Sequence, residues 1–141
     1  MTDNSTREIA LRWVELYNDG TPEFYGSDRF LELFHEDVDW HEMPHQYGPE
    51  GNSGSRSALR EAVRAAQAMF VDRCLELHDI LAVGNQTAMR YTWEATVAAD
   101  GLLVPKGTRL RSAVAQFLTL RDGKISASTE YISWPPPGTA G

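Results

Sequence analysis

Glu42 is the side chain best placed for acid–base chemistry. Residues 37–42 alternate between polar and apolar types, which is typical of a β-strand with one buried face. Glu42 shares the predicted buried face with Val38 and Trp40. Burial disfavours the charged form of a carboxylate and raises its pKa toward the range that suits a general base. We therefore expect Glu42 to be a catalytic base; the alternative is a carboxylate at a strand end that turns back to solvent.

Gln116 and Glu130 are two further candidates for a catalytic role. Gln116 falls on a predicted strand face with Val114 and Leu118, where an amide needs partners because an unpaired buried polar group is costly. Its amide can donate a hydrogen bond to an oxygen that gains charge, or it can bond to a neighbouring strand. Glu130 shares a face with Trp134, which predicts a second acid near the same pocket.

The segment His41-Glu42-Met43-Pro44-His45 matches by letter the zinc-protease pattern, in which two histidines meet on one helical turn. The preceding alternation indicates a strand instead, and Pro44 lacks the amide that a helix needs there. We therefore predict no metal. A site that uses His41 and His45 from an extended segment remains a weaker alternative.

The first half of the chain has the periodicity of helices. Ser5 and Glu8 fit a capping box, and apolar residues follow at helical spacing as far as Gly20. Thr21-Pro22 predicts the start of a second helix with Phe34 on its apolar side, and a third helix is expected over about residues 57–70. Residues 44–57 have the composition of a loop.

The second half has the pattern of strands. Strand-like runs cover residues 74–83, 86–98, 108–120 and 124–134, and turn residues separate them, as in Asp122-Gly123. Helices followed by a meander of strands predict the α+β class: a cone of three N-terminal helices packed on a strongly curved, mainly antiparallel sheet. We expect one domain over residues 1–134 and a flexible proline-rich tail over 135–141.

Aromatic residues recur on the predicted inward faces. In a cone with a cavity such side chains form the walls, where apolar area binds a ligand and a few polar groups orient it. The predicted substrate-binding residues are Trp13, Tyr17, Trp40, Phe70 and Trp134.

Composition limits the classes of partner. The formal net charge of −7 disfavours nucleic acid, and no apolar run is long enough to cross a membrane. The polar N-terminus does not resemble an export signal, so we expect a cytoplasmic protein. Cys74 is the only cysteine and is predicted to be a small buried group in a strand.

Several motifs, in order along the chain, together resemble one family. They are Trp13–Gly20, Leu33–Trp40, Gly54–Arg60, Ala88–Trp93, Pro105–Gly107 and Phe117–Ile125. This order resembles the SnoaL-like branch of the nuclear transport factor 2-like superfamily, which includes ketosteroid isomerase, scytalone dehydratase, limonene epoxide hydrolase and aromatic polyketide cyclases.

The resemblance implies roles for three of these residues. Glu42 falls where ketosteroid isomerase has its catalytic carboxylate, and Gln116 falls approximately at its oxyanion-stabilising acid. Trp13 lies near the position of a tyrosine that donates to the substrate oxygen. The resemblance also implies a homodimer and a reaction that needs no cofactor.

The function expected from the resemblance is proton transfer on a small, mostly apolar carbonyl or polyketide-type compound, as in an isomerase, cyclase or dehydratase. One difference argues against assigning the cyclase or epoxide-hydrolase mechanism of other members directly to this chain. Ser133 occupies a place where many members have an aspartate. Two alternatives stay open. One is a non-catalytic binding or dimerisation domain. The other is an epoxide hydrolase, which would need an arginine flanked by two carboxylates, whereas Arg90 is expected to pair with Glu94 on the surface.

Overall fold

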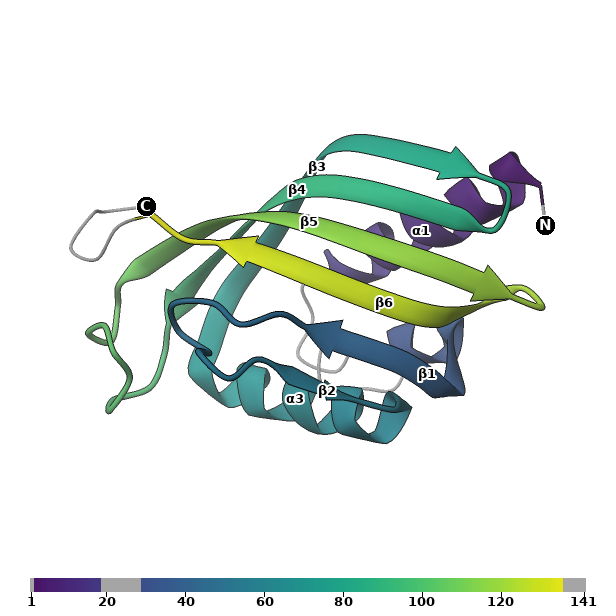
Figure 1. Cartoon of the computed structure of the whole chain (residues 1–141). Coiled ribbons are helices and arrows are strands. Elements are labelled where there is room, and N and C mark those ends of the chain that lie inside the picture. The colour runs from purple at the N-terminus through teal and green to yellow at the C-terminus, as the bar shows by residue number, and fades with distance from the viewer. Residues whose placement is uncertain (1, 19–28, 136–141) are drawn as a thin grey trace.

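One six-stranded sheet, covered on one face by helices, makes up the protein (Figure 1). The computed structural model describes residues 2–18 and 29–135. The elements in these ranges are α1 (Asp3–Tyr17), a 3-10 turn η1 (Phe30–Leu33), β1 (Phe34–Glu42), β2 (Asn52–Gly54), α3 (Arg56–Met69), β3 (Phe70–Val83), β4 (Gln86–Val97), β5 (Arg109–Arg121) and β6 (Lys124–Ser133). None of the described helices is long and apolar enough to span a membrane.

The strands lie in the order β2-β1-β6-β5-β4-β3. Neighbouring strands are antiparallel except for β1 and β6, which run parallel, so the prediction of a mainly antiparallel sheet is confirmed. The turn between β5 and β6 has positive φ at both Asp122 and Gly123, 51° and 79°. Two positive φ values are what a tight two-residue hairpin turn requires, as the Asp-Gly pair predicts.

The strands alternate between an inner face, which packs on the helices, and an outer face. In β5 every second residue from Leu110 to Leu120 is buried, which places Ser112 and Gln116 inside. Helix α1 packs mainly against β3, and α3 packs mainly against β1. This arrangement is the predicted α+β cone, and its interior lies between the two helices and the inner face of the sheet.

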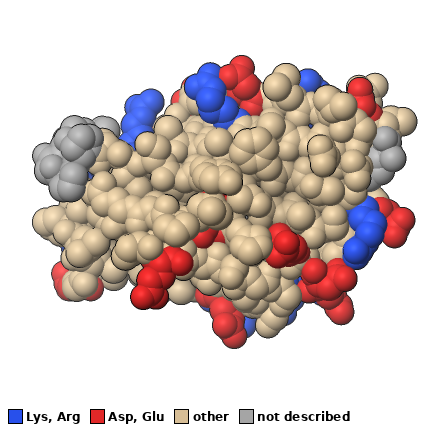
Figure 2. All heavy atoms as spheres, in the orientation of Figure 1, with Lys and Arg blue, Asp and Glu red and all other residues tan. Residues whose placement is uncertain are grey.

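The outer face of the sheet carries an aromatic pair. Phe117 on β5 and Tyr131 on β6 are each 49% exposed, and their rings meet edge to face with centroids 6.0 Å apart. Figure 2 shows this face, where uncharged side chains cover the centre and most charged side chains lie toward the edges.

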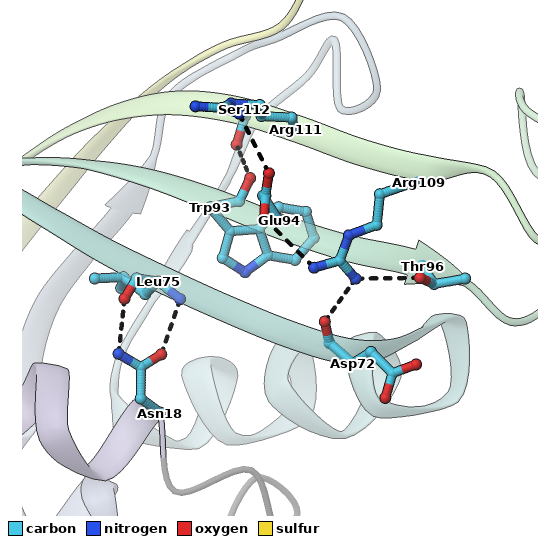
Figure 3. A network of polar contacts seen from close by, with 9 residues as sticks. All are labelled: Asn18, Asp72, Leu75, Trp93, Glu94, Thr96, Arg109, Arg111 and Ser112. Atoms are coloured by element: carbon cyan, nitrogen blue, oxygen red, sulfur yellow. Dashed lines mark hydrogen bonds and ion pairs between the residues drawn. The ribbon is translucent and has the colours of Figure 1, made fainter. Parts of the chain in front are cut away.

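The end of α1 is joined to the edge strand β3 by a side chain that imitates a strand. The Asn18 amide donates to the carbonyl oxygen of Leu75 at 2.7 Å, and its oxygen accepts from the backbone N–H of Leu75 at 2.8 Å (Figure 3). These two bonds satisfy backbone groups on the free edge of the sheet.

Several predicted boundaries differ from the structure. Helix α1 begins at Asp3 because Thr2, rather than Ser5, caps it: the Thr2 hydroxyl accepts from the backbone N–H of Ser5. Phe34 opens β1 instead of closing a helix, and the three-residue strand β2 lies inside the predicted loop. The predicted helix start at Thr21-Pro22, the helix end at Gly20 and residues 136–141 of the predicted tail lie outside the described residues.

Cys74 is exposed, so the prediction of a buried thiol was wrong. The pairing of β3 with β4 shifts register between Val71 and Cys74, and Asp72 has a positive φ of 52° there. A bulge of this kind changes which residues point inward. As a result Leu75 is buried and Cys74 faces outward.

Candidate functional site

A cavity of about 560 Å³ lies between the helices and the inner face of the sheet. Its size is in the range of pockets that hold small organic molecules. All five residues predicted to bind substrate line it: Trp13 and Tyr17 from α1, Trp40 from β1, Phe70 at the start of β3, and Trp134 just after β6. No lysine or arginine is among the described residues that line the cavity.

Two carboxyl groups lie side by side in the wall of this cavity. Glu42 ends β1 and Glu130 lies on β6, and the two residues are register partners in the parallel pairing of these strands. Both line the cavity. The alternation within each strand predicted an inward position for each glutamate, but it could not predict that β1 and β6 pair. The structure therefore shows that the two predicted acids are direct neighbours, which the sequence alone did not show.

The two carboxyl groups have different surroundings, and those of Glu130 favour its protonated form. Burial, and next the charge of Glu42, raise the pKa of Glu130 from 4.5 to about 8, while the indole N–H of Trp40 acts in the opposite direction. Glu130 is consequently protonated at neutral pH and can donate a proton or a hydrogen bond.

Glu42 is held by a histidine from the following turn. His45 Nε2 lies 3.2 Å from Glu42 Oε2. The other ring nitrogen, Nδ1, accepts from the backbone N–H of Tyr47 at 3.2 Å and from Trp134 Nε1 at 3.0 Å. Because Nδ1 accepts two hydrogen bonds, we assign the proton to Nε2, which then donates to Glu42. The His45 side chain is only 9% exposed and that of Glu42 is 30% exposed.

The turn that carries His45 is closely packed. His45 and Gly48 exchange two backbone hydrogen bonds of 3.0 and 3.1 Å. A Cβ atom at position 48 would lie 2.9 Å from His45 Nε2, so only glycine leaves room for the ring as it stands. Sequence reasoning considered His45 only as a metal ligand. Its position three residues after Glu42 was the available signal for the contact seen here.

Gln116 is buried behind the cavity wall and is not among the lining residues. Its oxygen accepts from the Tyr91 hydroxyl at 2.8 Å, and its NH2 group donates to Ser128 Oγ at 3.0 Å and to Glu130 Oε1 at 3.4 Å. Burial is the main cause that raises the pKa of Tyr91, followed by the charges of Glu130 and Glu42, which keeps its hydroxyl protonated. Gln116 thus reaches the cavity through Glu130 and Tyr91 rather than directly.

Trp93 separates the cavity from the polar outer face of β4. Its indole N–H donates to the Tyr17 hydroxyl at 2.7 Å. The next residue, Glu94, points the other way and forms ion pairs of 3.5 Å with both Arg109 and Arg111 (Figure 3). The predicted pairing of Glu94 with Arg90 was therefore wrong.

Arg90 instead pairs with Asp79 of β3, at 2.8 and 2.6 Å, and is exposed. The Arg90 and Glu94 side chains have other partners because the register sets Asp79 opposite Arg90 and Arg111 opposite Glu94. No arginine is flanked by the two cavity carboxyl groups among the described lining residues.

The loop between β4 and β5 forms part of the cavity wall. Gly101 and the three apolar residues after it line the cavity. Leu103 is nevertheless 76% exposed, so its side chain is open both to the cavity and to solvent. We take this loop to be the mouth of the cavity.

The two histidines of the His-Glu-Met-Pro-His segment contact different carboxylates. His41 Nε2 lies 2.7 Å from Asp39 and His45 Nε2 lies near Glu42. The segment is strand and loop, not a helix, so the zinc-protease geometry is not formed. Within residues 2–18 and 29–135 there is no group of three or more histidine, cysteine, aspartate or glutamate residues that could hold a metal ion.

Ser133, the residue in place of the expected aspartate, is exposed at the end of β6 and does not line the cavity. The acidic group that β6 supplies to the cavity is Glu130, three residues earlier. The position of the acid therefore differs from the one that the resemblance implies.

A cone of helices and sheet around one apolar cavity is the architecture of the nuclear transport factor 2-like class. Residues 10–128 match the sequence profile of the SnoaL-like domain. Because the match spans most of the chain, the protein belongs to the SnoaL-like family. No curated protein matches the sequence significantly.

Solved structures with the same fold are distant in sequence. AclR from Streptomyces galilaeus, a candidate hydroxylase, is 20% identical, with a TM-score of 0.75 over 96% of this chain and 83% of its own. IdmH from Streptomyces antibioticus, a candidate polyketide cyclase, is 22% identical, with a TM-score of 0.71 over 90% of this chain and 91% of its own. At these identities the likeness shows the fold alone.

A third structure with this fold holds a small ligand. It is a protein with a ketosteroid isomerase-like fold from Catenulispora acidiphila, in complex with trimethylamine. It is 16% identical, with a TM-score of 0.67 over 89% of this chain and 85% of its own.

Proposed function

We propose that this SnoaL-like protein is an enzyme that moves a proton on a small, mostly apolar carbonyl compound. The observation that carries the proposal is the Glu42–Glu130 pair in the wall of an apolar cavity, because the surroundings of Glu130 favour its protonated form while Glu42 beside it accepts a hydrogen bond from His45. Such a difference between two neighbouring carboxyl groups is typical of an acid and a base that work together.

In the proposed reaction, the Glu42 carboxylate removes a proton from the carbon next to the carbonyl group. The electron pair of the broken C–H bond forms a C=C bond, and the carbonyl oxygen accepts a hydrogen bond or a proton from the Glu130 carboxyl group. Return of the proton to another carbon gives an isomer. Attack of the enol carbon on a second carbonyl group closes a ring, and loss of a neighbouring hydroxyl group as water gives a dehydrated product. None of these steps calls for a cofactor.

The cavity lining supports a neutral, polyketide-type substrate. Aromatic and aliphatic side chains form most of its surface, and an anionic group would meet two acidic residues without a lysine or arginine among the described lining residues. The fold likeness to a candidate polyketide cyclase agrees with this class of compound.

Hydrogen–deuterium exchange tests the proposal without knowledge of the natural substrate. The purified protein is incubated in D2O with 2-tetralone, an apolar ketone with acidic C–H bonds, and deuterium incorporation is followed by NMR. We expect the protein to accelerate exchange, and Glu42→Gln to lower the rate by about 100-fold or more while 2-tetralone still binds. Glu76→Gln, on an exposed part of β3, is the matched control and should exchange at the wild-type rate. Full activity in Glu42→Gln would exclude the proposed base.

Two other functions make different predictions in the same experiment. A non-catalytic binding domain would bind 2-tetralone and leave its exchange rate at the background value. An epoxide hydrolase would open an apolar epoxide to a diol, a reaction for which the cavity lacks a described arginine between its carboxyl groups.

We further propose that a second copy of the chain packs on the outer face of the sheet to form a homodimer. The exposed Phe117–Tyr131 pair supports this proposal, because large aromatic side chains are enriched at protein interfaces. Sedimentation as a monomer at micromolar concentration would contradict it.

A further inference from the structure

The indole N–H of Trp40 is buried, yet it meets no acceptor among the described residues at the distance and angle of a hydrogen bond. The side chain is only 2% exposed, and it lines the cavity. Buried donors are almost always paired in native proteins, and those that are not occur at sites where a water molecule or a ligand atom accepts.

Three other donors of the cavity wall are engaged elsewhere. The indole of Trp93 donates to Tyr17, the indole of Trp134 donates to His45, and the hydroxyl of Tyr91 donates to Gln116. Each of these hydrogen bonds joins two side chains around the cavity, so its donor is not free to bind a ligand. Trp40 therefore contributes a donor that the fold itself does not use.

The position of Trp40 places this donor beside the carboxyl pair. Trp40 lies two residues before Glu42 on the same face of β1, and its register partner on β6 is Ser128, two residues before Glu130. The N–H is near enough to lower the pKa of Glu130, yet no acceptor meets it at the distance and angle of a hydrogen bond. The N–H of Trp40 and the carboxyl group of Glu130 thus address the same part of the cavity.

We propose that Trp40 Nε1–H and the Glu130 carboxyl group together bind one carbonyl oxygen of the substrate, which makes Trp40 a catalytic residue. This inference rests on the proposed function and extends it by naming the group that the site recognises. Two donors on one oxygen leave the neighbouring carbon directed toward Glu42. They also stabilise the negative charge that develops on the oxygen as the proton leaves carbon.

The ligand class that follows is a neutral molecule with a ketone oxygen at one end of an apolar body. Trp13, which the resemblance implied as the donor to this oxygen, is in this account a wall of the cavity. Trp13 therefore provides a matched control, because both tryptophans line the same cavity and only one has a donor directed at the carboxyl pair.

The experiment compares two probes with nearly the same shape, 2-tetralone and tetralin, which lacks the oxygen. Affinities are measured by calorimetry for the wild type, Trp40→Phe and Trp13→Phe. We expect the preference of the wild type for 2-tetralone over tetralin to fall by about fivefold or more in Trp40→Phe, because one hydrogen bond to the oxygen is lost. Trp13→Phe should lower the affinity for both probes equally and leave the preference for 2-tetralone unchanged.

NMR of the unmodified protein provides a readout that does not depend on the folding of a variant. The indole N–H resonance of Trp40 should move downfield on addition of 2-tetralone and stay in place on addition of tetralin. An unchanged Trp40 resonance at saturation, a preference that survives in Trp40→Phe, or failure of 2-tetralone to bind would each overturn the inference.

The outcome is separable from that of the proposed function. A Trp40 response without any deuterium exchange would support the oxygen site and contradict the enzyme. Exchange that depends on Glu42 and is unaffected by Trp40→Phe would support the enzyme and contradict the oxygen site.

Discussion

Glu42 and Glu130 are the same type of residue in two different surroundings. The Glu42 carboxylate is 30% exposed and accepts a hydrogen bond from His45. The Glu130 carboxyl group lies partly buried beside it, and burial together with the charge of Glu42 raises its pKa to about 8. The proposed division into base and acid rests on these different surroundings.

Glu130→Gln should change how the stability of the protein depends on pH. The pKa of Glu130 is about 8 in the folded protein and near 4.5 when unfolded, so the folded state binds the extra proton between these values. The stability contribution of Glu130 is therefore fully present below pH 4.5 and is lost as pH rises toward 8, on the order of 5 kcal/mol at most.

Urea unfolding at pH 5 and pH 8 measures this effect. Glu130→Gln should remove most of the decrease in the free energy of unfolding between the two pH values, because glutamine does not titrate. The exposed control Glu76→Gln should keep the decrease of the wild type. A wild type and a Glu130→Gln variant with the same pH dependence would show that Glu130 is solvated.

The turn after β1 determines how the base is held. His45 is placed by its backbone bonds to Gly48 and by the indole of Trp134, which comes from the far end of the chain. Gly48→Ala should push the imidazole away from Glu42, because the added Cβ would lie 2.9 Å from Nε2. We expect the exchange rate with 2-tetralone to fall by about tenfold and the His45 ring signals to shift in NMR spectra.

A double variant separates this contact from a general effect on the turn. In a His45→Ala background the ring is absent, so Gly48→Ala should have little further effect on exchange. Unchanged His45 signals in the single variant Gly48→Ala would contradict the proposed packing.

The contact between α1 and β3 also determines the shape of the cavity. Trp13 and Tyr17 line the cavity from α1, and Leu75 lines it from β3. Asn18→Ala would leave the backbone N–H and C=O of Leu75 without their partners. We expect the free energy of unfolding to fall by about 2 kcal/mol, as measured by urea unfolding. Asn18→Asp keeps the acceptor and loses the donor, so it should lose less. Equal stability of the wild type and Asn18→Ala would show that water replaces the side chain.

The elements with a strong local pattern were predictable, and the site was only partly so. Alternation along β1 and β6 placed Glu42 and Glu130 on inward faces, and the Asp122-Gly123 turn was evident from residue type. The pairing of β1 with β6 joins segments that are distant in sequence, and no local pattern encodes such a contact. The Cys74 prediction was wrong for a different reason: it rested on how often cysteine is buried in proteins, and such an average does not take account of the bulge in β3 next to this residue.

At the scale of the whole molecule, we propose that the inner face of the cone binds a ligand and the outer face binds a second copy of the chain. The inner face contains the cavity and the carboxyl pair. The outer face presents the Phe117–Tyr131 pair at the centre of the sheet. The SnoaL-like family, the cone and a second acid at Glu130 were predictable from the sequence, whereas the position of Glu130 directly beside Glu42 needed the structure.

Phe117→Asp should convert the proposed dimer to a monomer, because a charge at the centre of the interface would be buried without a partner. Sedimentation velocity at micromolar concentration measures the change. Leu103→Asp is the control, since Leu103 is more exposed than Phe117 but lies at the mouth of the cavity. A Phe117→Asp variant that sediments as a dimer would place the interface on another surface.

We propose above all that Glu42 and Glu130 form an interacting pair in the wall of the apolar cavity. Titration of the Glu130 side-chain carboxyl carbon by NMR tests this claim most directly. The account predicts a pKa of about 8 in the wild type and a lower value in Glu42→Gln, where the neighbouring charge is removed. A pKa near 4.5 in both proteins would contradict it.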